Sequence, residues 1–290
     1  MKVEPLSDAL GAELVEFDIK RPCTLEERSL LRRFFCKYHL LLVRGQDVKA
    51  EDQTRFVGYF GPMHRRADGK QETFISNRVE KGVATGQSRL LWHQDGTYGI
   101  HPGIATSLLA EDVSPDAVPT LFANAVRALE QLPAALRSRI EPLHTVHGKD
   151  AYLERTDVRF SVDNIPDDAP GEQFVTFEQP IIYDTPHSRQ KTLLVSEFFT
   201  SHVVELPREQ SEDLLQDLFS RLYADGNVYG HKWQAQDVII WDNMALHHCR
   251  PADMGTATRR MRRQSLDGWF TNDGTIDWPE TVVARARTAD

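Results

Sequence analysis

The chain has 290 residues, of which 40% are hydrophobic and 27% are charged, which is typical of a folded globular protein and excludes a disordered or fibrous one. Its net charge of −9 argues against nucleic acid or an anionic membrane as a partner, because both attract basic surfaces, and favours a small molecule. The three cysteines are odd in number and far apart, and neither a secretory signal nor an apolar stretch of about 18 residues occurs, so we expect a cytoplasmic protein with free thiols.

Four segments have the apolar spacing of amphipathic helices, at residues 24–38, 50–62, 124–140 and 207–224. In the first, Thr24 and Glu27 match the capping-box pattern that begins a helix. The second is expected to stop at Gly61 and Pro62, and Pro133 is expected to start a new helix within the third. We expect each helix to bury its apolar side.

The other clear segments are rich in β-branched and aromatic residues and predict strands, at residues 39–45, 173–184, 191–199, 237–243 and 263–270. They do not alternate regularly with helices, so a doubly wound parallel sheet is not expected. The pattern favours a mainly β fold with flanking helices, such as a jelly roll. Because no repeat or linker marks a boundary, we expect one domain over residues 1–290, with an N-terminal helix and strand portion over about 1–80 and helical insertions at 120–145 and 205–225 packed on the barrel.

The stretch LLWHQDGTYG places His93 and Asp95 two residues apart in a segment with the composition of a strand. Side chains at i and i+2 of a strand point to the same face, roughly 7 Å apart at their Cα atoms, so the pair can bind one metal ion. An imidazole and a carboxylate suit Fe(II), Mn(II) or Zn(II), and a second histidine would complete a facial triad. By itself such a pair is more often a surface or hydrogen-bonding pair, so the interpretation depends on that histidine.

Two adjacent histidines, His247 and His248, follow the apolar segment DVIIWDNMAL far downstream. Neighbouring residues of a strand point to opposite faces. Only one of the two can therefore join the first pair.

These motifs together resemble the taurine dioxygenase family of Fe(II)/2-oxoglutarate-dependent oxygenases, which also contains the 2,4-dichlorophenoxyacetate dioxygenases. The resemblance rests on WHQD, WDNMALHH and RRMRRQSLDG in that order, and extends to PLSDALGAELVEFDI, HLLLVRGQDV, YFGPMH and VPTLFANAVRALEQLP. It covers nearly the whole chain. It implies a double-stranded β-helix, which is a cupin-like jelly roll, and the use of Fe(II), 2-oxoglutarate and O2.

The resemblance implies that His93, Asp95 and His248 ligate the iron and form the catalytic centre. In the family, the distal histidine is the eighth residue counted from the tryptophan of the Trp-Asp-Asn motif, which gives His248 rather than His247. The motif itself, at residues 241–243, is expected to brace the strand end rather than to act in catalysis.

The co-substrate needs a fixed cation for its distal carboxylate, and the planar fork of arginine suits that role. The segment RRMRRQ offers four arginines, and the family's second arginine of the leading pair implies Arg260. Alternation then puts Arg262 on the same face and turns Arg259 away. Thr120, which closes SPDAVPT, is implied as the residue that shares the carboxylate, although the family's glycines are missing there.

On the substrate side, the resemblance implies His64 of FGPMHRR as a contact. Sulfonate- and phenoxyacetate-oxidising members have an arginine four residues beyond the co-substrate arginine, and counting from Arg260 gives Gln264. The loss of such a cation removes a charge-assisted hydrogen bond of roughly 1.5–3 kcal/mol. A simple sulfonate or aryloxyacetate is therefore not the first expectation, although Arg262, on the same face, keeps an anionic substrate open.

The expected reaction is oxidation, most simply hydroxylation, of a C–H bond of a small organic molecule, with release of succinate and CO2. Retention of Asp95 argues against halogenation, whereas desaturation, cyclisation and C–O or C–S cleavage remain open. A non-catalytic metal-binding jelly roll and a zinc hydrolase with the same three ligands are the alternatives from other classes. Family members often form dimers or tetramers, so a homo-oligomer also remains open.

Overall fold

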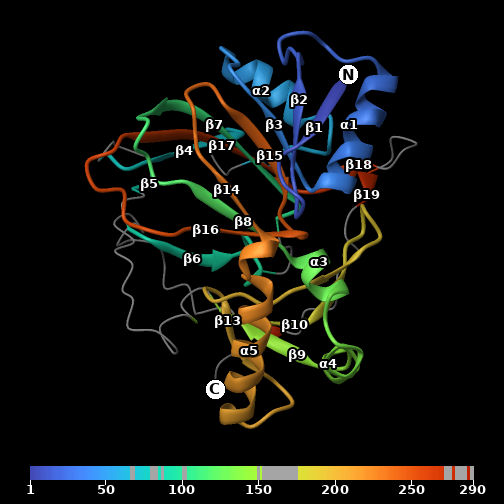
Figure 1. Ribbon diagram of the computed structural model, residues 1–290. Helices are drawn as coiled ribbons and strands as arrows, with labels where there is room; N and C mark the ends of the chain where they lie inside the picture. The colour runs from blue at the N-terminus through green and yellow to red at the C-terminus, as the bar shows by residue number, and fades with distance from the viewer. Residues whose placement is uncertain are drawn as a thin grey trace.

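The computed structural model describes residues 1–65, 69–78, 84–85, 88–99, 103–148, 151, 176–270, 276–277 and 286–287. Its centre is a pair of antiparallel-rich sheets (Figure 1). The larger sheet has the strand order β1 (Lys2–Pro5), β2 (Ala12–Val15), β3 (Leu40–Val43), β15 (Val238–Asp242), β7 (Ala105–Val113), β17 (Arg259–Leu266), β4 (Glu72–Ser76) and β5 (Ala84–Thr85). The smaller has the order β14 (Val228–His231), β8 (Thr120–Asn124), β16 (Leu246–Arg250) and β6 (Leu90–His93).

The two sheets enclose one apolar core. Along β3, Leu40 and Leu42 face this core, where they meet Phe122 of the smaller sheet and Met261 of β17. The alternate residues of β3 face the other side and pack under helices α1 (Leu25–Tyr38) and α2 (Ala50–Val57). A strand buried on both faces explains why residues 40–43 form an uninterrupted apolar run. This two-sheet arrangement confirms the prediction of a mainly β jelly roll.

Helix α1 begins as the sequence predicts. The Thr24 side chain accepts a hydrogen bond from the Glu27 backbone, and the Glu27 carboxylate accepts one from the Thr24 backbone. His39 ends the helix in the left-handed region at φ 60°, and β3 begins at the next residue.

Helix α2 ends earlier than expected, at Val57 rather than at Gly61 and Pro62. Phe60 leaves the helix and is fully buried between Phe35 and Trp269. At Gly61, a Cβ atom would lie 2.1 Å from the carbonyl oxygen of Gly268, so the close approach of two backbones requires glycine there.

Most of the other helices and small sheets lie beside the smaller sheet, and several of them share a second core, which includes Leu214 and Leu218. Pro133 precedes the second of these helices, as predicted. The elements are α3 (Ala125–Glu130), α4 (Ala134–Ile140), α5 (Arg208–Leu222), a 3-10 turn (Asp225–Asn227), a sheet of β13 (Thr200–Val203), β9 (His144–His147), β10 (Thr176–Pro180) and β20 (Ala286–Arg287), and the pairs β11 (Ile182–Asp184) with β12 (Lys191–Leu193) and β18 (Trp269–Phe270) with β19 (Ile276–Asp277). The last pair of strands is separate, because its Trp269 packs on Phe35 of α1.

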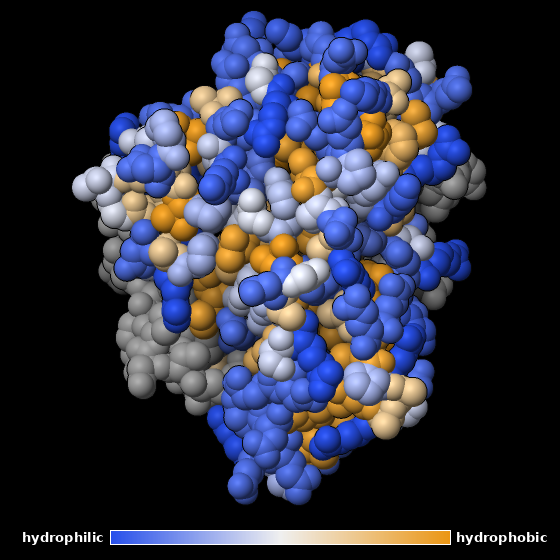
Figure 2. Space-filling view, viewed as in Figure 1, coloured by the Kyte–Doolittle hydropathy of each residue, from blue (hydrophilic) through white to orange (hydrophobic). Residues whose placement is uncertain are grey.

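Hydrophilic residues cover most of the face shown in Figure 2, with apolar residues between them. Within the part of the chain that the structure describes, no helix is both long enough and apolar enough to span a membrane.

Candidate metal and co-substrate site

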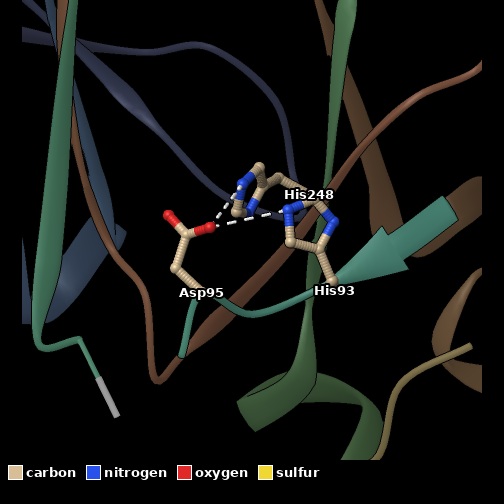
Figure 3. Close-up of side chains that lie close together, drawn as sticks. All are labelled: His93, Asp95 and His248. Carbon is tan, nitrogen blue, oxygen red and sulfur yellow. Dashed lines mark ion pairs between the residues drawn. The ribbon is translucent and has the colours of Figure 1, made fainter. Parts of the chain in front are cut away.

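Two histidines face each other across paired strands of the smaller sheet. His93 is the last residue of β6, and the register of the sheet places it directly opposite His248 of β16. Asp95 completes the group, and one ligand atom from each of the three residues lies within 4.8 Å of the others (Figure 3). The Asp95 Oδ1 atom lies 3.6 Å from His93 Nε2 and 3.8 Å from His248 Nε2.

Asp95 reaches the histidines by a different route from the one expected. The strand ends at His93, so Asp95 lies in the following turn rather than on the same strand face. Asn243 holds this turn: its Oδ1 accepts from the Asp95 backbone N–H at 2.8 Å, and its Nδ2 donates to the Asp95 carbonyl at 2.9 Å and to the Gly103 carbonyl at 2.7 Å. From the sequence, residues 241–243 are expected to brace a strand end. Asn243, the last of them, instead braces the turn that carries Asp95.

The imidazoles are orientated by their surroundings. His93 Nδ1 lies 2.8 Å from the Leu91 carbonyl, so Nδ1 carries the proton and Nε2 presents its lone pair. His248 lies against Phe122 and Trp241, with ring centroids 6.3 and 5.0 Å away. Two imidazoles and a carboxylate form the donor set of a facial triad that suits a divalent iron.

The neighbouring His247 points away from this group. It lies on the opposite side of β16, where its Nδ1 is 3.1 Å from the Tyr223 hydroxyl and its Nε2 is 3.3 Å from the Leu193 carbonyl. Burial lowers the pKa of His247 to about 3, so the ring is neutral near pH 7. The two histidines are therefore separated as strand alternation predicts.

The two oxygens of Asp95 have different environments. Its Oδ2 accepts hydrogen bonds from Arg263 Nη2 at 2.8 Å and from Thr106 Oγ1 at 3.2 Å, while Oδ1 faces the histidines. Burial by itself would raise the pKa of Asp95, but Arg263 and the two histidines together hold it well below its usual value. One oxygen of an ionised carboxylate is thus available for a metal ion.

The arginine-rich strand corrects the expectation for the co-substrate site. The guanidinium that reaches Thr120 belongs to Arg259, whose Nη2 donates to Thr120 Oγ1 over 3.0 Å. The pairing of Arg260 with Thr120 is therefore wrong. Arg260 lies on the other face, where it forms an ion pair with Glu111 and lies over the Phe74 ring.

Arg262 and Gln264 share that outer face. Arg262 Nε donates to Glu111 at 2.8 Å, and Gln264 Nε2 donates to Thr54 of α2 at 2.6 Å. Both contacts lie under α2 rather than toward the metal ligands, so the expectation that these two residues line the substrate site is contradicted.

The register of β17 explains the error. Its inward residues Arg259, Met261 and Arg263 pair with Val113, Ala110 and Leu108 of β7, and the last two belong to the core between the sheets. The inward face of β17 thus lies one residue away from the expected one, and such a shift reverses every side chain of a strand. The sequence does contain a signal for the inward face: Met261 is the one apolar residue in RRMRR, and it is fully buried.

Arg259 is a buried cation without a counter-ion. Within the described residues it forms no ion pair, and its Nε has no hydrogen-bond partner. Burial lowers its pKa to about 9, with Arg250 adding repulsion. Thr120 Oγ1 also accepts from Trp233 Nε1 at 3.0 Å, which leaves the Thr120 hydroxyl proton free to donate. The pair can therefore bind a carboxylate.

His64 lies at the end of β17. Its backbone N–H donates to the Ser265 carbonyl at 2.8 Å, and its exposed ring is 2.7 Å from the Asp267 carboxylate. Closer to the metal ligands, Phe198 and Phe199 both have ring centroids 5.7 Å from that of His93, and Tyr98 packs on Phe199 at 4.8 Å. These rings form an apolar wall beside the metal-ligand group.

Comparisons with known proteins identify the family of the chain. The model of the family described as "Taurine catabolism dioxygenase TauD, TfdA family" matches residues 2–264. The alpha-ketoglutarate-dependent 2,4-dichlorophenoxyacetate dioxygenase of Cupriavidus pinatubonensis is 25% identical over 288 residues, which cover 91% of this chain and 96% of that enzyme. The alkylsulfatase of Acinetobacter baylyi is 26% identical over 284 residues, or 93% of this chain and 86% of that enzyme. A crystal structure of a taurine dioxygenase from Burkholderia xenovorans matches with a TM-score of 0.74 at 25% identity, over 95% of this chain and 94% of that one.

Proposed function

The chain belongs to the taurine catabolism dioxygenase TauD/TfdA family, and we propose that His93, Asp95 and His248 hold its iron. The protein is an alpha-ketoglutarate-dependent dioxygenase, an oxidoreductase that uses Fe(II), 2-oxoglutarate and O2 and acts on a small molecule. The iron, when bound, supplies the oxidation of a C–H bond, with release of succinate and CO2. The single observation that carries the assignment of its ligands is the convergence of the three donor atoms.

Arg259 and Thr120 are proposed to bind the distal carboxylate of 2-oxoglutarate. The support is a buried guanidinium without a counter-ion, next to a hydroxyl that already accepts two hydrogen bonds. A carboxylate placed there would neutralise the cation and accept the remaining hydroxyl proton. Arg259 takes the role that the sequence analysis gave to Arg260.

The substrate is proposed to be a small organic anion. Arg263 lies four residues beyond Arg259 on the same strand face, so the cation that appeared to be replaced by Gln264 is present. The two relatives have names that refer to anions, 2,4-dichlorophenoxyacetate and alkyl sulfates. His64, near the end of the same strand, remains a proposed second contact.

The position of Arg263 also bears on the outcome of the reaction. Because its guanidinium contacts the metal ligand Asp95, an anionic group that it binds lies close to the metal. The oxidised carbon is then near that group, and hydroxylation of a carbon bonded to sulfur or oxygen leads to cleavage of that bond. We therefore favour C–S or C–O cleavage of a sulfonate, sulfate ester or aryl ether, with the apolar body of the substrate against Phe198 and Phe199.

A substrate screen tests these proposals. Succinate release should be stimulated by anions from these three classes, and Arg263→Gln should abolish the stimulation while Arg260→Gln, on the outer face, should not. Anaerobic addition of Fe(II) and 2-oxoglutarate should give a weak visible charge-transfer band that His248→Ala loses. Stimulation by neutral compounds alone would contradict the substrate class, and turnover without O2 or 2-oxoglutarate would indicate a hydrolase.

A cytoplasmic location and a homo-oligomer remain proposals. The first is supported by three free cysteines in the described residues. Analytical ultracentrifugation would measure the oligomeric state.

A further inference from the structure

A second arginine, Arg250, lies in the interior next to the proposed carboxylate site. It ends β16 and follows Cys249, which pairs with Leu121, the residue next to Thr120 on β8. Strand alternation places it on the same face as His248, two residues earlier. It is 9% exposed, close to the 7% of Arg259.

The two guanidinium groups influence each other. Burial lowers the pKa of Arg259, and electrostatic repulsion from Arg250 adds to this effect. The acidic group that acts on Arg250 is Asp253, an exposed residue whose Oδ1 also accepts from the Arg89 backbone N–H. Burying two cations that repel each other is energetically unfavourable unless an anion binds near both of them.

The hydrogen bonds of Arg250 leave part of its fork for a ligand. Its Nε donates to the Ser88 carbonyl at 2.9 Å, and Nη2 donates to the same oxygen. These bonds fix the plane of the guanidinium and use one of its two terminal nitrogens. Nη1 has no protein partner among the described residues, and it is not sealed from solvent.

We propose that Arg250 is a second co-substrate-binding residue, which shares the distal carboxylate of 2-oxoglutarate with Arg259 and Thr120. This inference rests on the proposed function, because it takes Arg259 as the first cation of that site. It predicts that Arg250 distinguishes 2-oxo acids that have a distal carboxylate from those that lack one.

The test is equilibrium binding to the Mn(II)-loaded protein without O2, measured by calorimetry, so that no turnover is needed. The ligands are 2-oxoglutarate and 2-oxovalerate, which lacks the distal carboxylate. Arg250→Ala should weaken 2-oxoglutarate binding roughly 10- to 100-fold, as expected for a lost charge-assisted hydrogen bond, and leave 2-oxovalerate unchanged. Arg250→Lys should restore part of the affinity.

Two matched variants make the result decisive. Arg260→Ala removes the same charge from the outer face and should leave both ligands unchanged. Arg250→Gln keeps a donor for the Ser88 carbonyl without the charge, and it decides the question if Arg250→Ala fails to fold.

The proposal is overturned if Arg250→Gln binds 2-oxoglutarate as the wild type does, or if both ligands weaken equally. If Arg259→Ala also leaves 2-oxoglutarate binding unchanged, the proposed co-substrate site itself is wrong, which separates the two failures.

Discussion

At the scale of single residues, two adjacent histidines have opposite roles because of the strand that carries them. His248 faces Asp95, while His247 faces Tyr223 and is neutral at physiological pH. Their side chains are chemically identical, so only the face of β16 separates the proposed ligand from a core residue.

We expect His248→Ala to abolish Mn(II) or Fe(II) binding, because only two of the three proposed metal-binding side chains, those of His93 and Asp95, remain. His247→Ala should keep the metal but lower the free energy of unfolding by roughly 1–3 kcal/mol, since it removes a buried ring that contacts the Tyr223 hydroxyl and the Leu193 carbonyl. Calorimetry with Mn(II) and urea unfolding measure the two effects. If His247→Ala lost the metal and His248→Ala kept it, the metal-binding histidine would be His247.

Asn243 is a positioning residue: it offers no donor atom to the proposed metal site but holds Asp95 in place. Its amide holds both backbone groups of Asp95. Asn243→Ala should weaken metal binding by roughly 10- to 100-fold, the usual effect of losing an outer partner of a metal ligand. Asn124→Ala is the control, because Asn124 is also buried and hydrogen-bonded but acts on Ala9 and on the start of α3. Equal metal affinities in the two variants would contradict the role.

At the scale of elements, α5 supports both strands that carry the histidines. Tyr223, at its end, stacks on Trp92 of β6 with centroids 4.6 Å apart and an interplanar angle of 5°, and its hydroxyl contacts His247 of β16. One side chain next to a distant helix therefore contacts both β6 and β16.

Tyr223→Ala should lower the free energy of unfolding by roughly 3 kcal/mol, because a large ring leaves a packed position, and should weaken metal binding. Tyr223→Phe keeps the stacked ring and loses one hydrogen bond, so its metal affinity should stay close to that of the wild type. Urea unfolding and Mn(II) titration of both variants test this. A Tyr223→Ala protein with wild-type metal affinity would exclude the supporting role of α5.

At the scale of the whole molecule, the space between the sheets contains the proposed metal site and nearby arginines such as Arg259. A bound metal ion and a bound carboxylate should therefore stabilise the folded protein. A ligand that binds only the folded state adds about 2.7 kcal/mol at a hundredfold excess over its Kd. Mn(II) should therefore raise Tm, and succinate, added as a mimic of the co-substrate, should raise it further. In the Arg259→Ala variant, Mn(II) should still raise Tm, whereas succinate should no longer raise it further. A succinate increment of full size in this variant would place the carboxylate elsewhere.

The sequence by itself determined the capped helix at 25–38 and the mainly β fold, and it singled out the three residues proposed as metal ligands, because each depends on local spacing or on a family motif of several residues. Only the tertiary structure decided which arginine reaches Thr120 and where Asp95 lies. The reason is physical: the inward face of β17 depends on its register with β7, and the turn that carries Asp95 is held by Asn243 from a distant part of the chain. A shift of one residue in register exchanges the two faces of a strand, and local sequence spacing does not reveal which partner sets that register.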